Sequence, residues 1–209
     1  MLLTLSKEPQ LFLIVALAFI VAITIHEASH AIVATWLGDD LPRLQGRVTL
    51  NPLRHLDPLG TIMIAIAMFG WGRPVMVNPY RLRFGVHRGM ALVAGAGPLS
   101  NLLLAAVLTP TARELLSTGQ VGLSTSAILL IIQLNIVLAI FNLLPLPPLD
   151  GFSIVVGLLP PERAAQLEGA RRYGPGLLLG LFLAIAIIPG MTGIITGPSN
   201  WVLGQLLGS

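Results

Sequence analysis

Six apolar runs alternate with polar, turn-rich segments along this chain, and the alternation predicts helices that lie in a membrane. The runs cover residues 11–37, 59–70, 89–109, 125–146, 174–189 and 192–208. A helix needs about 20 apolar residues to cross the hydrocarbon core of a bilayer, and we expect the first, third, fourth and fifth runs to span it. The second run would be roughly 18 Å long as a helix, which is too short to cross. The last run is interrupted by glycine and proline and fits either a spanning or an interfacial helix.

The positions of the basic residues favour a second run that enters the membrane and returns to the same side. In that arrangement the polar segments 38–58, 71–88 and 150–173 share one side and carry ten of the twelve basic residues. These ten are Arg43, Arg47, Arg54, Arg73, Arg81, Arg83, Arg88, Arg163, Arg171 and Arg172. If residues 59–70 crossed instead, this basic charge would be divided between the two sides. Because loops rich in Lys and Arg stay in the cytoplasm, we expect cytoplasmic loops and an N-terminus outside.

Two turn-rich segments beside the second run contain stretches typical of short β-strands. Residues 46–50 (GRVTL) and 74–79 (PVMVNP) combine β-branched side chains with Gly, Pro and Asn. Both could equally be ordinary cytoplasmic connections. Non-helical backbone at membrane depth must be buried in protein or line a wet cavity. The predicted fold is therefore an all-α polytopic membrane protein, with a core of three transmembrane helices, peripheral helices and a small β or re-entrant element near the cytoplasmic face.

The composition fits one membrane domain and limits the chemistry available to it. Of the 209 residues, 55% are hydrophobic and 10% are charged, whereas soluble domains contain about 25% charged residues. The basic residues are scattered between apolar runs without forming a basic face, so we expect the lipid bilayer and no nucleic acid as a partner. The chain has no cysteine, so metal ligands must be His, Asp or Glu. We expect a single domain over residues 1–209, with a core over 11–151 and C-terminal helices over 174–208.

The first apolar run carries His26-Glu27-Ala28-Ser29-His30, a spacing typical of a metal site. Residues i and i+4 lie on one face of a helix, so both imidazoles can reach one metal ion. Glu27 would lie beside the metal, where its carboxylate can take a proton from a water molecule. Catalytic zinc usually has three protein ligands, so this interpretation requires a third ligand elsewhere in the chain.

Asp150 is the strongest candidate for the third ligand. It follows the apolar run 125–146 and a proline-rich turn, and an acid in such a place is costly unless it is paired or bound to a metal. In the re-entrant arrangement the runs 11–37 and 125–146 are parallel, which brings Asp150 to the depth of His26. An aspartate that caps a helix after a proline-rich exit loop would explain the same sequence without a metal.

Together these motifs resemble the site-2 protease family of intramembrane zinc metalloproteases. The matching stretches are residues 26–30, 46–60, 94–101 and 142–151, so the resemblance covers residues 20–151. It implies one zinc ion held by His26, His30 and Asp150, with Glu27 as general base and Asn142 holding the reacting carbonyl. It also implies a zinc endopeptidase of the bacterial cell membrane, with three catalytic transmembrane helices and a catalytic core over residues 11–151. The distribution of arginines places its active site in the cytoplasmic half. Such an enzyme cuts peptide bonds in or near substrate transmembrane segments, in regulated intramembrane proteolysis. No segment is long enough for the PDZ or CBS domain of some family members.

Several other polar or turn residues have candidate roles. Asn142 could donate a hydrogen bond to the developing oxyanion, or it could bridge two helices. A substrate helix must unwind before its carbonyls become accessible, and the extended substrate could then pair with backbone beside the site. The candidate substrate-binding residues are Val48, Thr49, Leu50, Pro145 and Pro147. We assign Asn101 and Asn135 to hydrogen bonds between helices, and a turn next to proline is enough to explain His55 and Asp57.

Two other classes of protein fit part of this pattern. In an ion- or metal-handling transporter, the same His, Glu and Asp residues could form an ion path, but the chain has no inverted repeat and few spans. A catalytically inactive relative could bind membrane helices without cutting them, and the intact Glu27 argues against it. We expect a protease whose partner is a membrane-protein substrate with a transmembrane segment.

Overall fold

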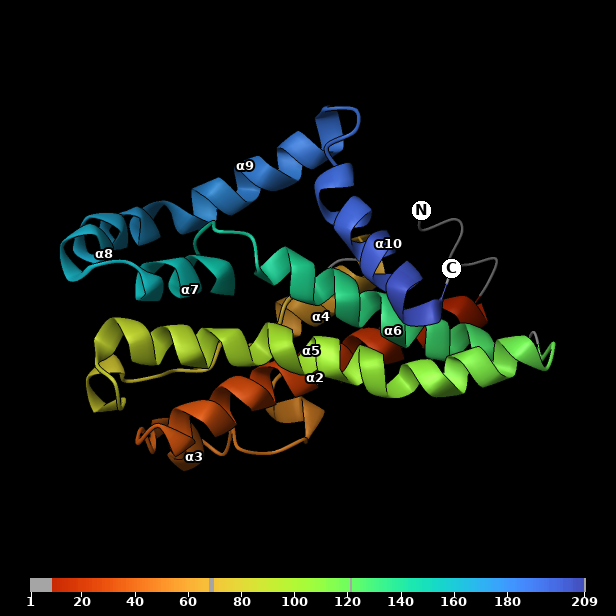
Figure 1. The fold of residues 1–209 in the computed structure, drawn as a ribbon, viewed down its shortest axis with the longest axis horizontal. Coiled ribbons are helices and arrows are strands. Elements are labelled where there is room, and N and C mark those ends of the chain that lie inside the picture. Colours follow the sequence, from red (N-terminus) through yellow and green to blue (C-terminus); the bar gives the residue numbers. More distant parts are fainter. Residues whose placement is uncertain (1–8, 68–69, 121, 209) are drawn as a thin grey trace.

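The computed structural model describes residues 9–67, 70–120 and 122–208, and within these ranges the regular secondary structure is helical (Figure 1). The α-helices are α2 (Pro9–Trp36), α3 (Leu41–Leu44), α4 (Pro58–Ala67), α5 (Val86–Ser117), α6 (Leu123–Asn142), α7 (Asp150–Leu158), α8 (Pro161–Glu168), α9 (Gly174–Ile187) and α10 (Gly193–Leu207). Three 3₁₀ turns join them: η1 (Pro52–Arg54), η2 (Pro79–Arg81) and η3 (Gly169–Tyr173). The all-α prediction is confirmed for this part of the chain.

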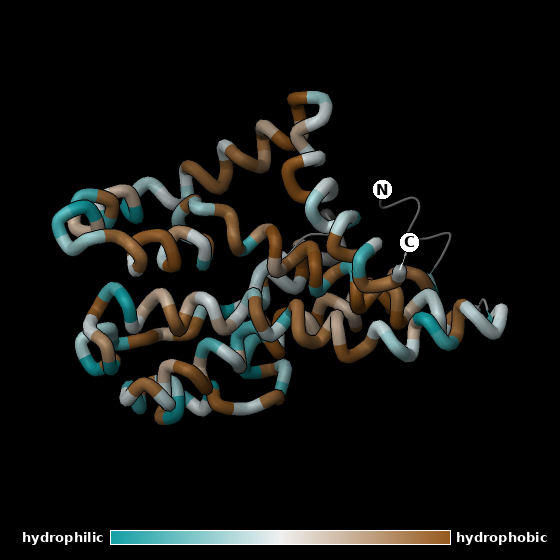
Figure 2. Tube along the Cα trace, in the orientation of Figure 1, coloured by the Kyte–Doolittle hydropathy of each residue, from teal (hydrophilic) through white to brown (hydrophobic). Residues whose placement is uncertain are grey.

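Among the described residues, four segments are long and apolar enough to cross a membrane, and they overlap the four runs that we expected to span. They are Pro9–Trp36, Val86–Ser117, Leu123–Asn142 and Pro161–Ile187. Figure 2 shows that hydrophobic residues dominate α6 and α9, while hydrophilic residues gather in the connections and around α8. A helix satisfies its own backbone hydrogen bonds, so a long apolar sequence of this kind is stable in lipid.

The helices α2, α5 and α6 pack together as the core of the molecule (Figure 1). Asn101 in α5 bonds to the Ala22 carbonyl of α2. Val93 lies earlier in α5 and bonds to His30, which lies later in α2. The two helices are therefore antiparallel, and α6, which returns along α5, runs parallel to α2. The buried side of α2 consists largely of small residues that let backbones approach closely; they are Ala18, Ala22, Ala28, Ala31 and Ala34.

The C-terminal helices surround this core unevenly. α7 packs along the first part of α5, where a Cβ placed on Gly157 would lie 2.2 Å from the Cβ of Ala91. α10 packs against α6 and the second half of α5. Leu203 and Leu206 of α10 cover a buried cluster around Ile132 there. α9 extends away from the core (Figure 1), and only 6% of the apolar window in Pro161–Ile187 is buried. Its apolar surface is thus available to lipid.

Neither of the stretches predicted as β-strands forms a strand, so this part of the prediction is wrong. In residues 46–50, Gly46 has a φ of +66° and the Thr49 N–H donates to the Arg47 carbonyl, so the chain bends. In residues 74–79, a proline at each end removes a backbone donor. The only bridge in the described part of the chain is an isolated antiparallel pair between Leu56 and Gly72.

The two ends of the second apolar run lie side by side. Its described part is the ten-residue helix α4, and residues 68–69 lie outside the described residues. The chain then returns to its starting point, where the Arg73 N–H donates to the His55 carbonyl at 2.7 Å. A segment this short, with both ends on the same side, does not need to cross a bilayer.

Candidate metal centre

Three candidate metal ligands that are far apart in the sequence meet between α2 and α7. His26 and His30 lie one turn apart on α2, and Asp150 is the first residue of α7. Asp150 Oδ2 lies 3.1 Å from His26 Nε2 and 3.3 Å from His30 Nε2. The two imidazoles are 4% and 8% exposed, so the cluster is largely shielded from solvent. The helix N-terminus also favours the Asp150 carboxylate, because the helix dipole is positive there.

Hydrogen bonds at Nδ1 of His26 and of His30 determine which nitrogen of each neutral ring carries the proton. His30 Nδ1 lies 2.7 Å from the Val93 carbonyl, which can only accept, so Nδ1 carries the proton. His26 Nδ1 lies 2.6 Å from Asn101 Oδ1. The Asn101 amide nitrogen donates to the Ala22 carbonyl at 3.0 Å, which identifies the atom that faces His26 as the oxygen. In the neutral form of each ring, which is the form that binds a metal, Nε2 therefore presents a lone pair to the centre of the cluster.

This arrangement fits a zinc ion. Asp150 Oδ2 is buried and has no hydrogen-bond partner among the described residues, although two imidazole nitrogens face it. Converging acceptors of this kind repel one another unless a cation lies between them. Ligands about 2.0–2.1 Å from a tetrahedral zinc ion are about 3.3 Å apart, close to the two distances from Asp150 Oδ2 to the imidazole nitrogens. Two imidazoles and a carboxylate are also a ligand set that zinc accepts.

Two glycines are required where backbones approach the cluster. A Cβ on Gly97 of α5 would lie 2.5 Å from His30 Nε2 and 2.6 Å from His26 Cε1. A Cβ on Gly151 would lie 2.2 Å from the Leu143 carbonyl oxygen. Gly97 therefore lets α5 pack directly on the imidazoles, and Gly151 lets α7 begin directly under the end of α6.

Glu27 lies beside the cluster and is 9% exposed. Its Oε2 is 3.8 Å from the Arg47 guanidinium, too far for a hydrogen bond but close enough for an ion pair. A Cβ on Gly72 would lie 3.1 Å from Glu27 Oε1, so the extended segment after α4 passes directly over the carboxylate. The first helix and both turn-rich segments thus meet at Glu27.

The remaining predicted site residues are not members of the metal-ligand cluster. The Asn142 amide donates to the Leu138 carbonyl one turn earlier, at 2.9 Å. Val48 and Leu50 are 41% and 67% exposed, and the Thr49 carbonyl accepts from His55 Nε2 at 2.7 Å. Of the two prolines predicted to bind substrate, Pro145 is exposed and Pro147 is buried.

His55 and Asp57 have structural contacts, as the turn next to proline had suggested. His55 is buried, and burial lowers the pKa of its imidazole from the ordinary value, against a smaller opposing effect of the bond to Thr49. Asp57 accepts from the Gly60 N–H at 2.9 Å, at the start of α4. Neither side chain reaches the metal-ligand cluster, whose members are His26, His30 and Asp150.

Sequence reasoning missed several residues that support the cluster. We had assigned Asn101 to a bond between helices, and it does donate to Asn135 Oδ1 at 2.7 Å. Asn101 also determines which ring nitrogen of His26 carries the proton, because its Oδ1 faces Nδ1. The position of Asn101 in an apolar helix, four residues after Gly97, did not reveal this contact. Arg47 was counted only as a basic loop residue, yet it is buried and faces Glu27.

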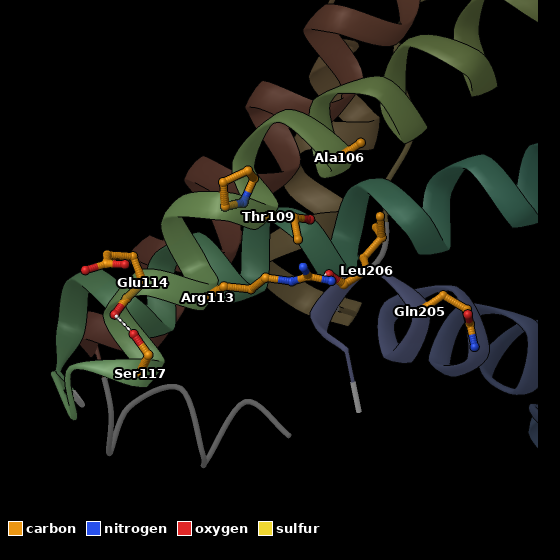
Figure 3. A pocket seen from close by; sticks show the side chains of 8 residues that line it. Ala106, Thr109, Arg113, Glu114, Ser117, Gln205 and Leu206 are labelled. Atoms are coloured by element: carbon orange, nitrogen blue, oxygen red, sulfur yellow. Dashed lines mark hydrogen bonds between the residues drawn. The ribbon is translucent and has the colours of Figure 1, made fainter.

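An open groove lies at the opposite end of α5 from the metal-ligand cluster (Figure 3). It has a volume of about 490 Å³ and lies between the last turns of α5 and the end of α10. Arg113 crosses its floor and donates from Nε to the Leu206 carbonyl at 2.8 Å. Its other lining residues include Thr109, Glu114 and Gln205, so it shares no residue with the metal-ligand cluster.

Comparisons with known proteins point to one family. The model of "Peptidase family M50" matches residues 116–186. A Bacillus subtilis (strain 168) protein named "Putative zinc metalloprotease YwhC" is 45% identical over 174 residues, which cover 80% of this chain and 78% of that protein. "Putative zinc metalloprotease Rip2" of Mycobacterium tuberculosis (strain ATCC 25618 / H37Rv) is 33% identical over 195 residues, which cover 91% and 73%. The Mycolicibacterium smegmatis protein of the same name is 30% identical over 179 residues, which cover 84% and 69%. No solved structure matches the chain.

Proposed function

The chain belongs to peptidase family M50, the site-2 protease family, and from this membership we propose that it is a zinc-dependent intramembrane endopeptidase. Its substrates would be membrane proteins, cut in or near a transmembrane segment. The observation that supports this most directly is the meeting of two imidazole lone pairs and a buried carboxylate oxygen beside Glu27. Structural zinc sites usually have four protein ligands, whereas catalytic sites have three and leave a position open.

His26, His30 and Asp150 would hold the zinc ion, each through the atom that faces the centre of the cluster. When bound, zinc supplies a Lewis acid that makes water nucleophilic near neutral pH and polarises a peptide carbonyl. The hydrogen bonds from His26 to Asn101 and from His30 to Val93 hold the imidazoles in the required orientation. The burial of both rings excludes bulk water from their ligating nitrogens.

Glu27 would serve as the general base and then as the general acid. Arg47 is its ion-pair partner at 3.8 Å, and at that distance both carboxylate oxygens can still accept a hydrogen bond from a water molecule. The carboxylate would take a proton from that water and return it to the leaving amine. The helix places Glu27 next to His26, so the base lies beside the reacting carbonyl.

Asn142 and the turns beside the cluster would contact the substrate. Asn142 would stabilise the oxyanion by exchanging its present bond to Leu138 for one to the substrate. An unwound substrate would lie along the exposed backbone near Val48 and Leu50, and against Pro145. The bent shape of residues 46–50 means that such pairing would be limited to short stretches.

The proposed topology places the metal centre in the cytoplasmic half of the membrane. It is supported by the joined ends of the second apolar run and by the parallel directions of α2 and α6. Because the chain has no cysteine, single cysteines give a clean test with a membrane-impermeant maleimide. We expect labelling of Tyr80→Cys, an exposed position in the segment 71–88, only after the cytoplasmic side is exposed, and labelling of Thr118→Cys from outside. The reverse pattern would invert the topology.

Proteolysis is tested with the purified chain in proteoliposomes. The probes are fluorescent single-span membrane proteins, half of them with glycine or proline in the transmembrane segment to ease unwinding. We expect the wild type to cut at least one probe, a chelator to stop the reaction, and Glu27→Gln to be inactive while it still binds one zinc ion per chain. Zinc bound without cleavage of any probe would contradict the proposal. Zinc flux into the vesicles would favour a transporter instead.

A further inference from the structure

Arg47 is a buried charge that takes part in no bond-making or proton-transfer step of the proposed reaction. The residue is 5% exposed, although it lies in a turn-rich connection where arginine side chains normally reach solvent. A guanidinium stays charged in proteins, and burial lowers its pKa here while Glu27 acts in the opposite direction. Burying such a charge is costly unless it is paired and hydrogen-bonded, so its contacts should explain its position.

The Arg47 guanidinium joins three separate parts of the chain. Nη1 donates to the Arg54 carbonyl at 2.5 Å, at the end of η1. Nη2 donates to the Arg73 carbonyl, in the segment that follows α4. The same Nη2 lies 3.8 Å from Glu27 Oε2 on α2. One side chain therefore fastens both turn-rich segments to the helix that carries the base.

The two fastened segments also hold each other over Glu27. The Arg73 N–H donates to the His55 carbonyl, and Leu56 pairs with Gly72. Gly72 then lies against the Glu27 carboxylate, so a movement of this pair of segments would change the surroundings of the base. Arg47 provides the contact by which the position of the segments is coupled to Glu27.

The distance between Arg47 and Glu27 suits a group that orients a base without blocking it. At 3.8 Å the guanidinium attracts the carboxylate strongly in a buried site. It does not use an oxygen lone pair as a 2.8 Å bidentate pair would. Lysine could supply the charge, but its single nitrogen lacks the planar fork that reaches two carbonyls and a carboxylate together.

We propose that Arg47 is a positioning residue for Glu27, which holds the carboxylate in its reactive orientation and keeps residues 46–56 and 71–73 docked over it. The inference rests on the proposed proteolytic function. It predicts that removal of the guanidinium slows the chemical step and loosens the two segments, while the metal ligands and substrate affinity change little.

The test compares Arg47→Met, Arg47→Lys and Arg43→Met with the wild type in proteoliposomes. Arg43 is an exposed arginine on the neighbouring helix α3, so its substitution removes the same charge without a contact to Glu27. We expect Arg47→Met to lower kcat by about 30- to 100-fold, which is part of the roughly 10²- to 10⁴-fold that general acid–base catalysis contributes. KM should change by less than about threefold, because the lost interaction acts on the chemical step. Arg47→Lys should recover part of kcat, and Arg43→Met should match the wild type.

Two further measurements distinguish positioning from a general loss of structure. Zinc content should stay at one ion per chain in every variant. Hydrogen exchange of the Arg73 amide, which is bonded to His55, should become faster in Arg47→Met but not in Arg43→Met. An unchanged kcat, a change confined to KM, or a loss of zinc together with kcat would each overturn the inference. Cleavage by the wild type but not by Glu27→Gln would leave the proposed function standing in each of those cases.

Discussion

A single methyl group at Gly97 should disrupt the metal centre. The Cβ of Gly97→Ala would lie 2.5 Å from His30 Nε2 and 2.6 Å from His26 Cε1, whereas ordinary van der Waals contact begins at 3.4 Å. The imidazoles or α5 must therefore move by 0.8–0.9 Å. Zinc–ligand distances vary by only about 0.2 Å between sites, so this displacement is several times what the coordination tolerates. We expect zinc affinity to fall by about 10- to 100-fold or more, which is about 1.4–2.7 kcal/mol.

Gly95→Ala is the matched control for this prediction. Gly95 lies on the same helix, two residues earlier, and a Cβ there would meet no heavy atom within 4 Å. Both substitutions increase helix propensity by about 1 kcal/mol, so they differ only in the contact with the imidazoles.

Zinc affinity is measured by competition with a fluorescent chelator, and the thermal midpoint is measured on the apo and zinc-loaded forms. We expect zinc to raise the midpoint of the wild type and of Gly95→Ala, and to raise that of Gly97→Ala much less. Equal zinc affinity in Gly97→Ala and the wild type would refute the packing argument, because the methyl group would then have found space that the structure does not show.

Three further substitutions test the hydrogen bond to His26, the packing at Asp150 and the buried imidazole of His55. Asn101→Leu should lower zinc affinity by about 10- to 100-fold, because His26 loses the oxygen that fixes its protonation; unchanged affinity in the chelator competition would contradict this. Gly151→Ala should displace Asp150 with a similar loss of zinc, because its Cβ would meet the Leu143 carbonyl at 2.2 Å; a zinc content equal to that of the wild type would show that α7 can shift freely. The depressed pKa of His55 means that the unfolded chain binds a proton more readily than the folded chain. The stability that depends on neutral His55 is therefore complete above its ordinary pKa of about 6.5 and lost as the pH falls through the folded-state value. Thermal unfolding of the apo protein should show this decline and His55→Gln should lessen it; the same decline in both proteins would contradict the assignment.

Local patterns in the sequence were sufficient for the helices and for part of the site. Long apolar runs predict α2, α5 and α6 because only a helix satisfies its backbone groups within one segment in lipid. The spacing of His26 and His30 places both on one helical face whatever surrounds them. The residues predicted as zinc ligands do meet in the structure, and their binding of zinc is still to be measured.

The predicted strands failed for a physical reason. A strand depends on a partner for its hydrogen bonds, and strand propensity mainly reflects packing against neighbours. The residues of 46–50 instead use Arg47 to bind the Arg54 and Arg73 carbonyls, and these contacts hold the segment in a bend. The β-prone sequence did not indicate that its arginine would be buried.

The sequence by itself determined which segments are helical and which residue types could bind a metal, since both depend on neighbours along the chain. Only the tertiary structure decided that Asn101 faces His26, that Gly97 admits the imidazoles, and that Arg47 turns inward to Glu27. The physical reason lies in the membrane. A helix in lipid is apolar on every side, so its hydrophobic pattern does not show which face meets its neighbours. The rotation and depth of each helix are set by close packing and by a few buried hydrogen bonds, and these appear only when the helices are assembled.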